Sequence, residues 1–168
     1  MTPLRTKDTY QKQVYDFIKN VLVVCPSCSG QAIVKTNDLP LRNINEHEIK
    51  VTCTKCGYNK RLAEEPSSII YSSSDKVILG RHLVIGRAID TYFHLPLWLT
   101  SQSCDHTLWS YNYEHLDFLK SHIEATLRER NTQEMANNSI GSRLPKWMTS
   151  TKNRETILKA IAQLKTKV

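Results

Sequence analysis

The chain has 168 residues, of which 40% are hydrophobic and 8% aromatic, and its net charge at pH 7 is +7. This composition excludes a disordered tail, a collagen-like fibre and a low-complexity linker, so we expect one folded domain or two small packed modules. The N-terminal residues lack the apolar segment of a signal peptide, and the longest aliphatic run, residues 21–24, is far too short to span a bilayer. These features predict a cytoplasmic protein that does not bind membranes.

The first third of the chain is expected to form a helix and then a small sheet. Asp8 can cap a helix over residues 9–20, because apolar side chains recur there at helical spacing. Aliphatic residues that alternate with polar ones then predict four short strands, at residues 21–25, 31–35, 49–53 and 58–62.

The second half of the chain mixes strand and helix signals. Aliphatic runs at residues 77–79 and 83–85 each end in a Gly-Arg pair, which indicates turns or bulges between short strands. Residues 95–99 and 107–111 flank a polar turn and predict a hairpin with one tryptophan on each arm.

Two helices are expected to complete the chain. Leucine and isoleucine recur at helical spacing from about Asn112, and this helix can run to Arg130. The last helix is indicated by an apolar face with cations on its other side, and that face consists of Ile157, Leu158, Ile161 and Leu164.

Two Cys-x-x-Cys pairs carry the clearest chemical signal in the sequence. Cys25 and Cys28 form the first pair, and Cys53 and Cys56, followed by Gly57, form the second. A two-residue gap lets both thiolates of a tight turn reach one ion, and two such turns supply the four tetrahedral ligands of a structural Zn²⁺ site. The pattern therefore predicts one zinc ion per chain.

Redox-active dithiols are the alternative interpretation of these pairs. A thioredoxin-like pair begins a helix in a βαβ unit, whereas both pairs here lie between short strands, which favours metal. Five cysteines in 168 residues are also too few for a disulfide framework, and an odd number would leave one cysteine unpaired. A shell of four sulfurs leaves no open position for substrate, so the metal is expected to be structural and to be coupled to folding.

The two pairs and the strands around them resemble the zinc ribbon of the general transcription factor IIB type, over about residues 21–65. The resemblance implies a ribbon of short antiparallel hairpins around zinc. Ribbons of this class occur in transcription factors, polymerase subunits, topoisomerases, primases and adaptor proteins. The resemblance therefore implies a role connected with nucleic acids but does not define that role. The rest of the chain is similar to bacterial proteins known only as zinc-ribbon-containing proteins.

An α+β fold follows from these elements, with the ribbon preceded by a helix and followed by a mixed module of a β hairpin and C-terminal helices. We expect four segments along the chain: an N-terminal helix at residues 1–20, the zinc ribbon at 21–65, a linker at 66–76 and an α+β module with basic C-terminal helices at 77–168. The linker is expected because this stretch contains Pro66 and the serine run at residues 72–74.

The sequence contains no recognisable catalytic motif, and we expect a protein that is not an enzyme. It has only five glycines and no phosphate-binding loop, no serine elbow and no paired metal-binding carboxylates. Cys104 and His106 could form a nucleophile pair or a second metal site, but no third orienting group is evident. No small-molecule substrate is implied.

The positive charge is concentrated at the C-terminal end. Residues 128–168 carry nine basic and three acidic residues, a surplus of +6, whereas residues 1–127 have a surplus of only +1. Clustered cations attract nucleic acid because binding releases counterions, although a solvated lysine-rich helix face is an equally good interpretation.

Two functions are therefore kept open. The first is nucleic-acid binding, for which the candidate residues are Lys55, Lys60, Arg61, Arg143, Lys146, Lys152, Arg154, Lys159 and Lys165. The alternative is a protein-interaction adaptor that docks on a larger complex through the ribbon and the tryptophan-bearing hairpin, Trp98 and Trp109.

Overall fold

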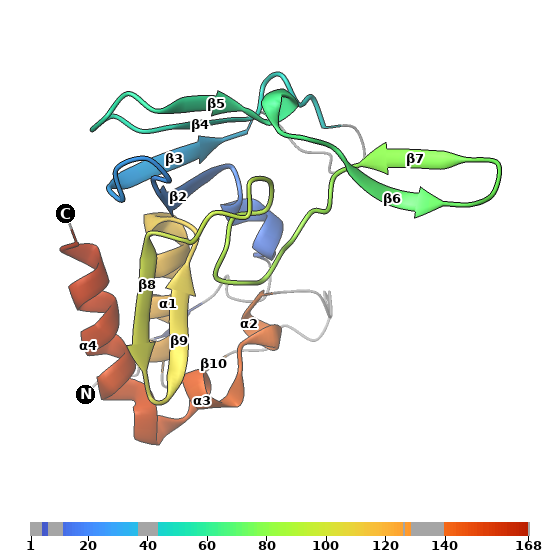
Figure 1. The fold of residues 1–168 in the computed structure, drawn as a ribbon. Coiled ribbons are helices and arrows are strands. Elements are labelled where there is room, and N and C mark those ends of the chain that lie inside the picture. The colour runs from blue at the N-terminus through green and yellow to red at the C-terminus, as the bar shows by residue number, and fades with distance from the viewer. Residues whose placement is uncertain (1–4, 7–11, 37–43, 126, 129–139, 168) are drawn as a thin grey trace. The chain divides into compact units, whose positions relative to one another are not determined.

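The computed structural model describes residues 5–6, 12–36, 44–125, 127–128 and 140–167, and it has the expected α+β composition (Figure 1). The chain divides into two compact units. One unit contains residues 18–98, and the other combines residues 1–17 with residues 99–168. The unit of residues 18–98 is therefore one continuous segment, and the other unit, called the second unit below, contains the segments before and after it.

The unit of residues 18–98 is built on a four-stranded antiparallel sheet in the order β2-β3-β4-β5. Its apolar side includes Val21, Val34 and Val51, all fully buried. The four predicted strands are confirmed to within two residues, as β2 (Asn20–Val24), β3 (Gln31–Lys35), β4 (Lys50–Thr52) and β5 (Asn59–Arg61).

The outer edge of β2 forms backbone hydrogen bonds with a loop from the end of the same unit. The backbone N–H of Trp98 donates to the carbonyl of Leu22 at 2.9 Å, and that of Val24 donates to Pro96 at 2.9 Å. The loop is held in shape by the buried Asp90, whose carboxylate accepts hydrogen bonds from three backbone amides, those of Tyr92, Phe93 and Leu95. This loop places Leu97 in the core beside the sheet.

The same unit also contains a separate hairpin, formed by β6 (Ser68–Ser72) and β7 (Val77–Gly80) (Figure 1). It follows a short 3-10 helix, η2 (Leu62–Glu64). Residues 66–76, expected as a linker, thus contain a strand and a turn, because the serine run connects two strands that pair with each other.

The other unit contains a second hairpin, β8 (Leu99–Ser103) with β9 (His106–Ser110), and two helices, α1 (Tyr113–Glu124) and α4 (Arg154–Lys165). Helix α4 packs against α1 and β8. The remaining elements are β1 (Arg5–Thr6), which pairs in parallel with β10 (Leu127–Arg128), and the short helices η1 (Val14–Phe17), α2 (Ile140–Arg143), α3 (Lys146–Thr149) and η3 (Thr151–Asn153).

Helix α1 begins where the sequence predicts. The Asn112 side chain accepts a hydrogen bond from the backbone N–H of His115 at 2.9 Å and so caps the first turn. The predicted apolar face of the last helix is largely confirmed, since Ile157, Ile161 and Leu164 are buried. Leu158 is only partly buried, and Ala160 takes a place in the core instead.

Two predicted helices are shorter than expected. Within the described residues 12–20, the N-terminal helix is reduced to η1, and Asn20 already belongs to β2; residues 7–11 lie outside the described part. The helix predicted to reach Arg130 ends at Glu124, because Ala125 has an extended backbone and Leu127 belongs to a strand.

The predicted hairpin around the polar turn is present but displaced along the chain. Its first strand begins at Leu99 rather than residue 95, and its turn contains only Cys104 and Asp105. The predicted domain boundaries stay predictions. Among the described residues, no helix is long and apolar enough to cross a membrane.

Candidate metal centre

The two cysteine pairs occupy matching turns at the ends of neighbouring hairpins. In the first turn the N–H of Ser29 donates to the carbonyl of Cys25 at 2.9 Å, and in the second the N–H of Gly57 donates to the carbonyl of Cys53 at 3.1 Å. Each turn is closed by a further backbone bond, from Cys25 to Gly30 at 2.7 Å and from Cys53 to Tyr58 at 2.8 Å. The repeated pattern gives both pairs the same local geometry.

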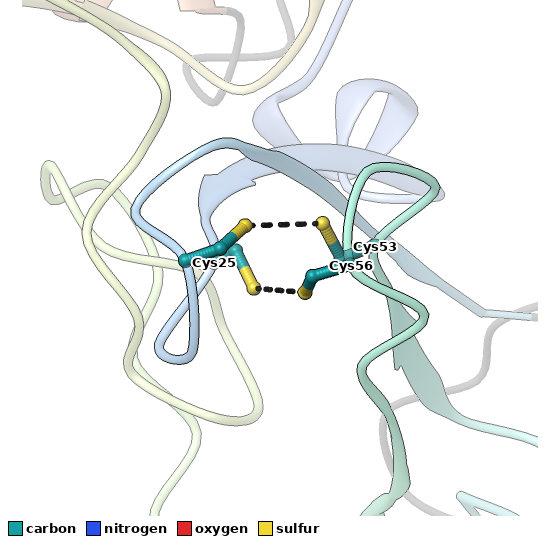
Figure 2. A group of neighbouring side chains, drawn as sticks. Cys25, Cys53 and Cys56 are labelled. Carbon is teal, nitrogen blue, oxygen red and sulfur yellow. Dashed lines mark hydrogen bonds between the residues drawn. The ribbon is translucent and has the colours of Figure 1, made fainter.

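The turns bring all four sulfur atoms together, as Figure 2 shows. The Sγ atoms of Cys25 and Cys56 lie 3.6 Å apart, those of Cys28 and Cys53 lie 3.7 Å apart, and all four lie within 4.8 Å of one another. A tetrahedral ion with metal–sulfur bonds of about 2.3 Å requires sulfur separations of roughly 3.8 Å. The cluster therefore fits a single tetrahedral metal ion.

Disulfide bonding does not account for this cluster. A disulfide requires a sulfur–sulfur distance of about 2.05 Å, and all five cysteines are free thiols. The 3.6 and 3.7 Å contacts also join sulfurs from different turns, Cys25 with Cys56 and Cys28 with Cys53. The two pairs thus act as one four-sulfur group rather than as two dithiols.

Without a metal, the thiols of Cys28 and Cys56 have pKa values shifted in opposite directions. The backbone N–H of Tyr58 and hydrogen bonds from the other thiols lower the pKa of Cys56 to about 7, against the opposing effect of burial. The backbone N–H of Gly30 favours the thiolate of Cys28, but its neighbouring thiols and burial raise the pKa of Cys28 to about 12. A bound divalent ion removes this conflict, because it stabilises all four thiolates at once.

Two glycines shape the site. Gly57 has a φ of +76°, a left-handed conformation that glycine adopts without strain, as its place after the second pair predicts. The sequence analysis missed the role of Gly30, where an added Cβ would lie 3.3 Å from the sulfur of Cys28 and 3.0 Å from the Lys55 side chain. The spacing Cys-x-x-Cys-x-Gly is the signal that could have revealed it.

The candidate nucleic-acid-binding residues belong to both units. Lys55, Lys60 and Arg61 lie in the unit of the metal site, and the other six lie in the second unit. Among them, Lys60 pairs with Glu65 at 2.8 Å and Lys165 pairs with Asp117. Arg154 is half-buried, and the exposed members are Lys55, Arg61, Arg143, Lys146, Lys152, Lys159 and Lys165.

The cations of α4 do not form one stripe. Arg154 and Lys165 are about three helical turns apart on one flank, whereas Lys159 points nearly opposite the buried face. A phosphate backbone therefore could not contact all three along a single line of the helix.

Cys104 lies in the turn of the β8–β9 hairpin and His106 begins β9, and neither belongs to a metal-ligand cluster among the described residues. The His106 ring instead stacks on Trp147, with ring centres 4.8 Å apart. Of the hairpin tryptophans, Trp98 is only 9% exposed, and Trp109 packs edge-on against Tyr111 and His115.

Comparison of the chain with protein-family models, with curated proteins and with solved structures finds no match. The zinc-ribbon-like character of the site therefore rests on its own geometry, and the resemblance to the transcription factor IIB type stays a prediction.

Proposed function

We propose that this chain is a non-enzymatic zinc-ribbon protein that binds one structural Zn²⁺ ion and uses its basic surface to bind nucleic acid. The observation that carries the metal assignment is the convergence of four sulfur atoms, from Cys25, Cys28, Cys53 and Cys56, at tetrahedral separations. Four thiolates complete the coordination of the ion, so it joins the two hairpins and has no position for a substrate.

We propose zinc because a tetrahedral shell of four cysteine thiolates is typical of structural zinc sites. Iron is the other ion that such a shell binds. Native mass spectrometry of the purified chain separates the two by mass, and an iron site would also be coloured. We expect the mass of one zinc ion per chain and a colourless protein. A folded chain that contains iron or no metal would contradict the assignment.

The nucleic-acid part of the proposal is supported by charge. The chain carries +7, most of it from residues 128–168, and three of these cations are exposed on α3, η3 and α4: Lys146, Lys152 and Lys159. Because the cations of α4 do not lie on one line, we expect the basic residues to contact phosphates individually, which gives binding driven by charge and shape rather than by base sequence.

The test is a fluorescence-anisotropy titration of the zinc-loaded chain with short single- and double-stranded DNA and RNA at several salt concentrations. Replacing Lys146, Lys152 and Lys159 by glutamine should reduce the slope of log affinity against log salt by roughly two to three. The matched control replaces three exposed cations outside the candidate set, Lys19, Lys76 and Arg87, and should leave most of the slope. Absence of binding at low salt would reject the nucleic-acid role.

The adaptor alternative has less support at the tryptophan-bearing hairpin. Trp98 is buried and Trp109 packs against other aromatic rings, so the tryptophans serve the folded core rather than an open docking surface. We therefore keep nucleic acid as the proposed partner.

A further inference from the structure

The four-stranded sheet brings three cations into direct register on neighbouring strands. Lys35 of β3 is paired with Lys50 of β4, and Lys50 is paired with Arg61 of β5. Side chains of directly paired residues lie on the same face of a sheet, and neighbouring strands are about 4.8 Å apart. The three cations therefore form a line about 10 Å long across three strands. We call Lys35, Lys50 and Arg61 the cation row.

The cation row lies on the open face of the sheet. All three residues are exposed, whereas the residues next to them in β3 and β4, Val34 and Val51, point to the opposite face and are fully buried. Each cation also occupies the end of its strand remote from the cysteine turns, because β3 and β5 begin after these turns and β4 ends before one. The row is therefore accessible and separate from the metal site.

Within the described part of the chain, no carboxylate forms an ion pair with the cation row. The fourth cation of these strands, Lys60, is paired with Val51 on the buried face, and its ammonium group contacts Glu65 at 2.8 Å. Like charges directly opposite each other on neighbouring strands destabilise a sheet. The row therefore contains two unfavourable pairs, Lys35 with Lys50 and Lys50 with Arg61, which a bound anion would relieve.

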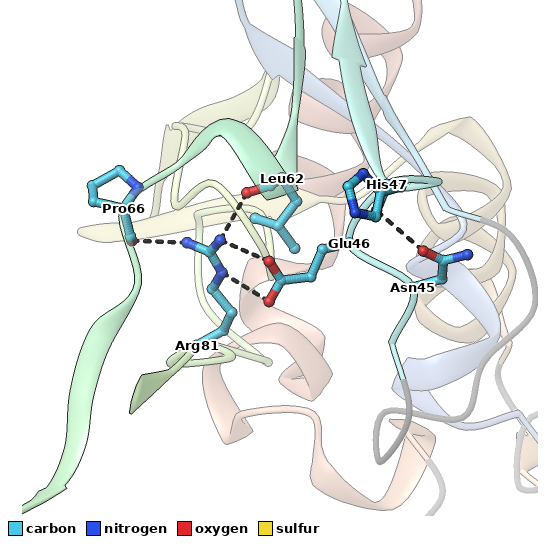
Figure 3. A network of polar contacts seen from close by, with 6 residues as sticks. All are labelled: Asn45, Glu46, His47, Leu62, Pro66 and Arg81. Atoms are coloured by element: carbon cyan, nitrogen blue, oxygen red, sulfur yellow. Dashed lines mark hydrogen bonds and ion pairs between the residues drawn. The ribbon is translucent and has the colours of Figure 1, made fainter. Parts of the chain in front are cut away.

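Arg81 holds the end of the sheet at which the row lies, as Figure 3 shows. Its guanidinium donates to both carboxylate oxygens of Glu46, at 3.1 and 2.7 Å, and to the carbonyl of Leu62 at 2.9 Å. Glu46 lies in the turn before β4 and Leu62 directly follows Arg61, so this side chain connects the segments next to β4 and β5. A surface fixed in this way loses little conformational freedom when it binds a ligand.

The composition of the open face favours phosphate over a protein surface as its partner. In β3, β4 and β5, the exposed residues are the cation row and Asn59, so the exposed groups are charged or polar. Strands β2–β5 contain no aromatic residue, whereas the centres of protein–protein interfaces are enriched in tyrosine, tryptophan and phenylalanine. Cations without aromatic anchors are suited to contacts with a phosphate backbone.

We propose that the cation row contacts the phosphate backbone of double-stranded nucleic acid. This inference rests on the proposed function and gives it a surface that includes two residues outside the candidate set, Lys35 and Lys50. A duplex carries one charge per about 1.7 Å of its axis, so a row about 10 Å long faces several phosphates. Unpaired bases would find no aromatic side chain to stack on in these strands, which favours the duplex over a single strand.

The experiment is a fluorescence-anisotropy titration of the zinc-loaded full chain with a short DNA duplex at several salt concentrations. Replacing all three residues of the cation row by glutamine should weaken binding at least about tenfold and reduce the slope of log affinity against log salt by roughly two to three. Glutamine at Lys19, Lys76 and Arg87 is the matched control, because these exposed residues are again two lysines and one arginine of the same unit. This control should keep most of the slope.

Two neighbouring residues of β5 provide a finer comparison. Arg61→Gln should reduce the salt slope by about one, because it removes one phosphate contact. Lys60→Gln should leave the slope nearly unchanged, because Lys60 is directed to the other face and pairs with Glu65. Equal effects of the two substitutions would show that the face of the sheet does not matter and would overturn the proposal.

Lys50 lies between the other two cations and gives a second readout. At low salt, Lys50→Gln should raise the melting temperature of the free chain by about one to three degrees, because it removes both unfavourable pairs. The same substitution should weaken duplex binding. A lower melting temperature with unchanged binding would show that Lys50 serves the stability of the sheet and would overturn the proposal.

The outcomes separate this inference from the proposed function. A chain that binds the duplex equally well with and without the cation row would overturn the inference and leave the proposed function standing. Absence of duplex binding by the wild-type chain at low salt would reject both. Binding to poly-glutamate as tight as to the duplex, and dependent on the row, would indicate an acidic protein partner and would also overturn the inference.

Discussion

Asp90 shows how one buried side chain can fix the shape of a loop. Its Oδ1 atom accepts hydrogen bonds from the amides of Tyr92 and Phe93 at 2.9 and 2.8 Å, and its Oδ2 atom accepts one from Leu95 at 2.6 Å. Burial raises the pKa of this carboxyl, while the three amides act in the opposite direction. The side chain thus supplies acceptors that the loop backbone cannot provide for itself.

We expect Asp90→Ala to lower the free energy of unfolding by about 2–4 kcal/mol, because three amides lose their acceptor inside the protein. Asp90→Asn keeps Oδ1 and should cost less, about 1 kcal/mol. Urea unfolding with zinc present measures both. An alanine variant as stable as the asparagine variant would show that the amide bonds are unimportant.

Individual residues were the easiest part of this protein to predict. The four cysteines and Gly57 were identified from spacing alone, because tetrahedral coordination requires particular residues in a short, fixed arrangement. The roles of Asp90 and Gly30 could not be predicted in the same way, since they depend on backbone groups and side chains that come near only after folding.

The β8–β9 hairpin has a two-residue turn in which both residues, Cys104 and Asp105, have positive φ values of 51° and 60°. Such a turn matches the twist of the strands, but it favours asparagine followed by glycine. We expect the double substitution Cys104→Asn with Asp105→Gly to stabilise the chain by about 0.5–1 kcal/mol.

Thermal unfolding measures this effect, and Asp105→Ala, which disfavours positive φ, is the control that should destabilise. If the Asn-Gly variant were less stable, the thiol of Cys104 or the carboxylate of Asp105 would have a structural role that backbone geometry does not explain.

Helix α1 carries a pH-sensitive group in its first turn. His115 is buried, stacks on Phe17 with ring centres 4.8 Å apart, and accepts a hydrogen bond from the backbone N–H of Tyr111. Burial lowers the pKa of His115 to about 4, against about 6.5 in an unfolded chain. The folded state therefore holds this ring neutral.

The unfolded chain binds a proton at His115 between pH 6.5 and 4 that the folded chain does not. Stability from this group should therefore be complete above pH 6.5 and decline as the pH falls toward 4, by on the order of 3 kcal/mol. Chemical denaturation at a series of pH values should give a flatter profile for His115→Phe. An unchanged profile would place the acid sensitivity elsewhere.

Elements were predicted well where local pattern and packing agree. The strands around the cysteines alternate as a half-buried sheet requires, and α1 has a cap and an apolar stripe. Within residues 12–20 the helix expected at residues 9–20 is reduced to η1, because β2 already begins at Asn20. A pairing between distant segments, such as β1 with β10, has no local signal.

The division of the whole chain could not be inferred from composition. Boundary rules look for a contiguous linker, but here the second unit contains both ends of the chain and the first unit lies between them in sequence. The serine run at residues 72–74, which suggested a boundary, lies where β6 ends and the turn to β7 begins.

The two units should respond differently to loss of metal. The ion joins the two cysteine turns, so the unit of residues 18–98 should lose its amide-exchange protection in β2–β5 when a chelator removes the zinc. The other unit contains no residue of the cysteine cluster and should keep protection in α1 and α4. Equal loss in both would show that their folding is coupled.

The most direct measurement is native mass spectrometry of the full chain beside two variants, Cys53→Ser and Cys104→Ser. We expect one zinc ion per chain in the wild type and in Cys104→Ser, because Cys104 lies outside the four-sulfur cluster, and a large loss of zinc in Cys53→Ser. A wild-type chain that folds without metal, or a Cys53→Ser variant that retains zinc as tightly as the wild type, would contradict the four-thiolate site.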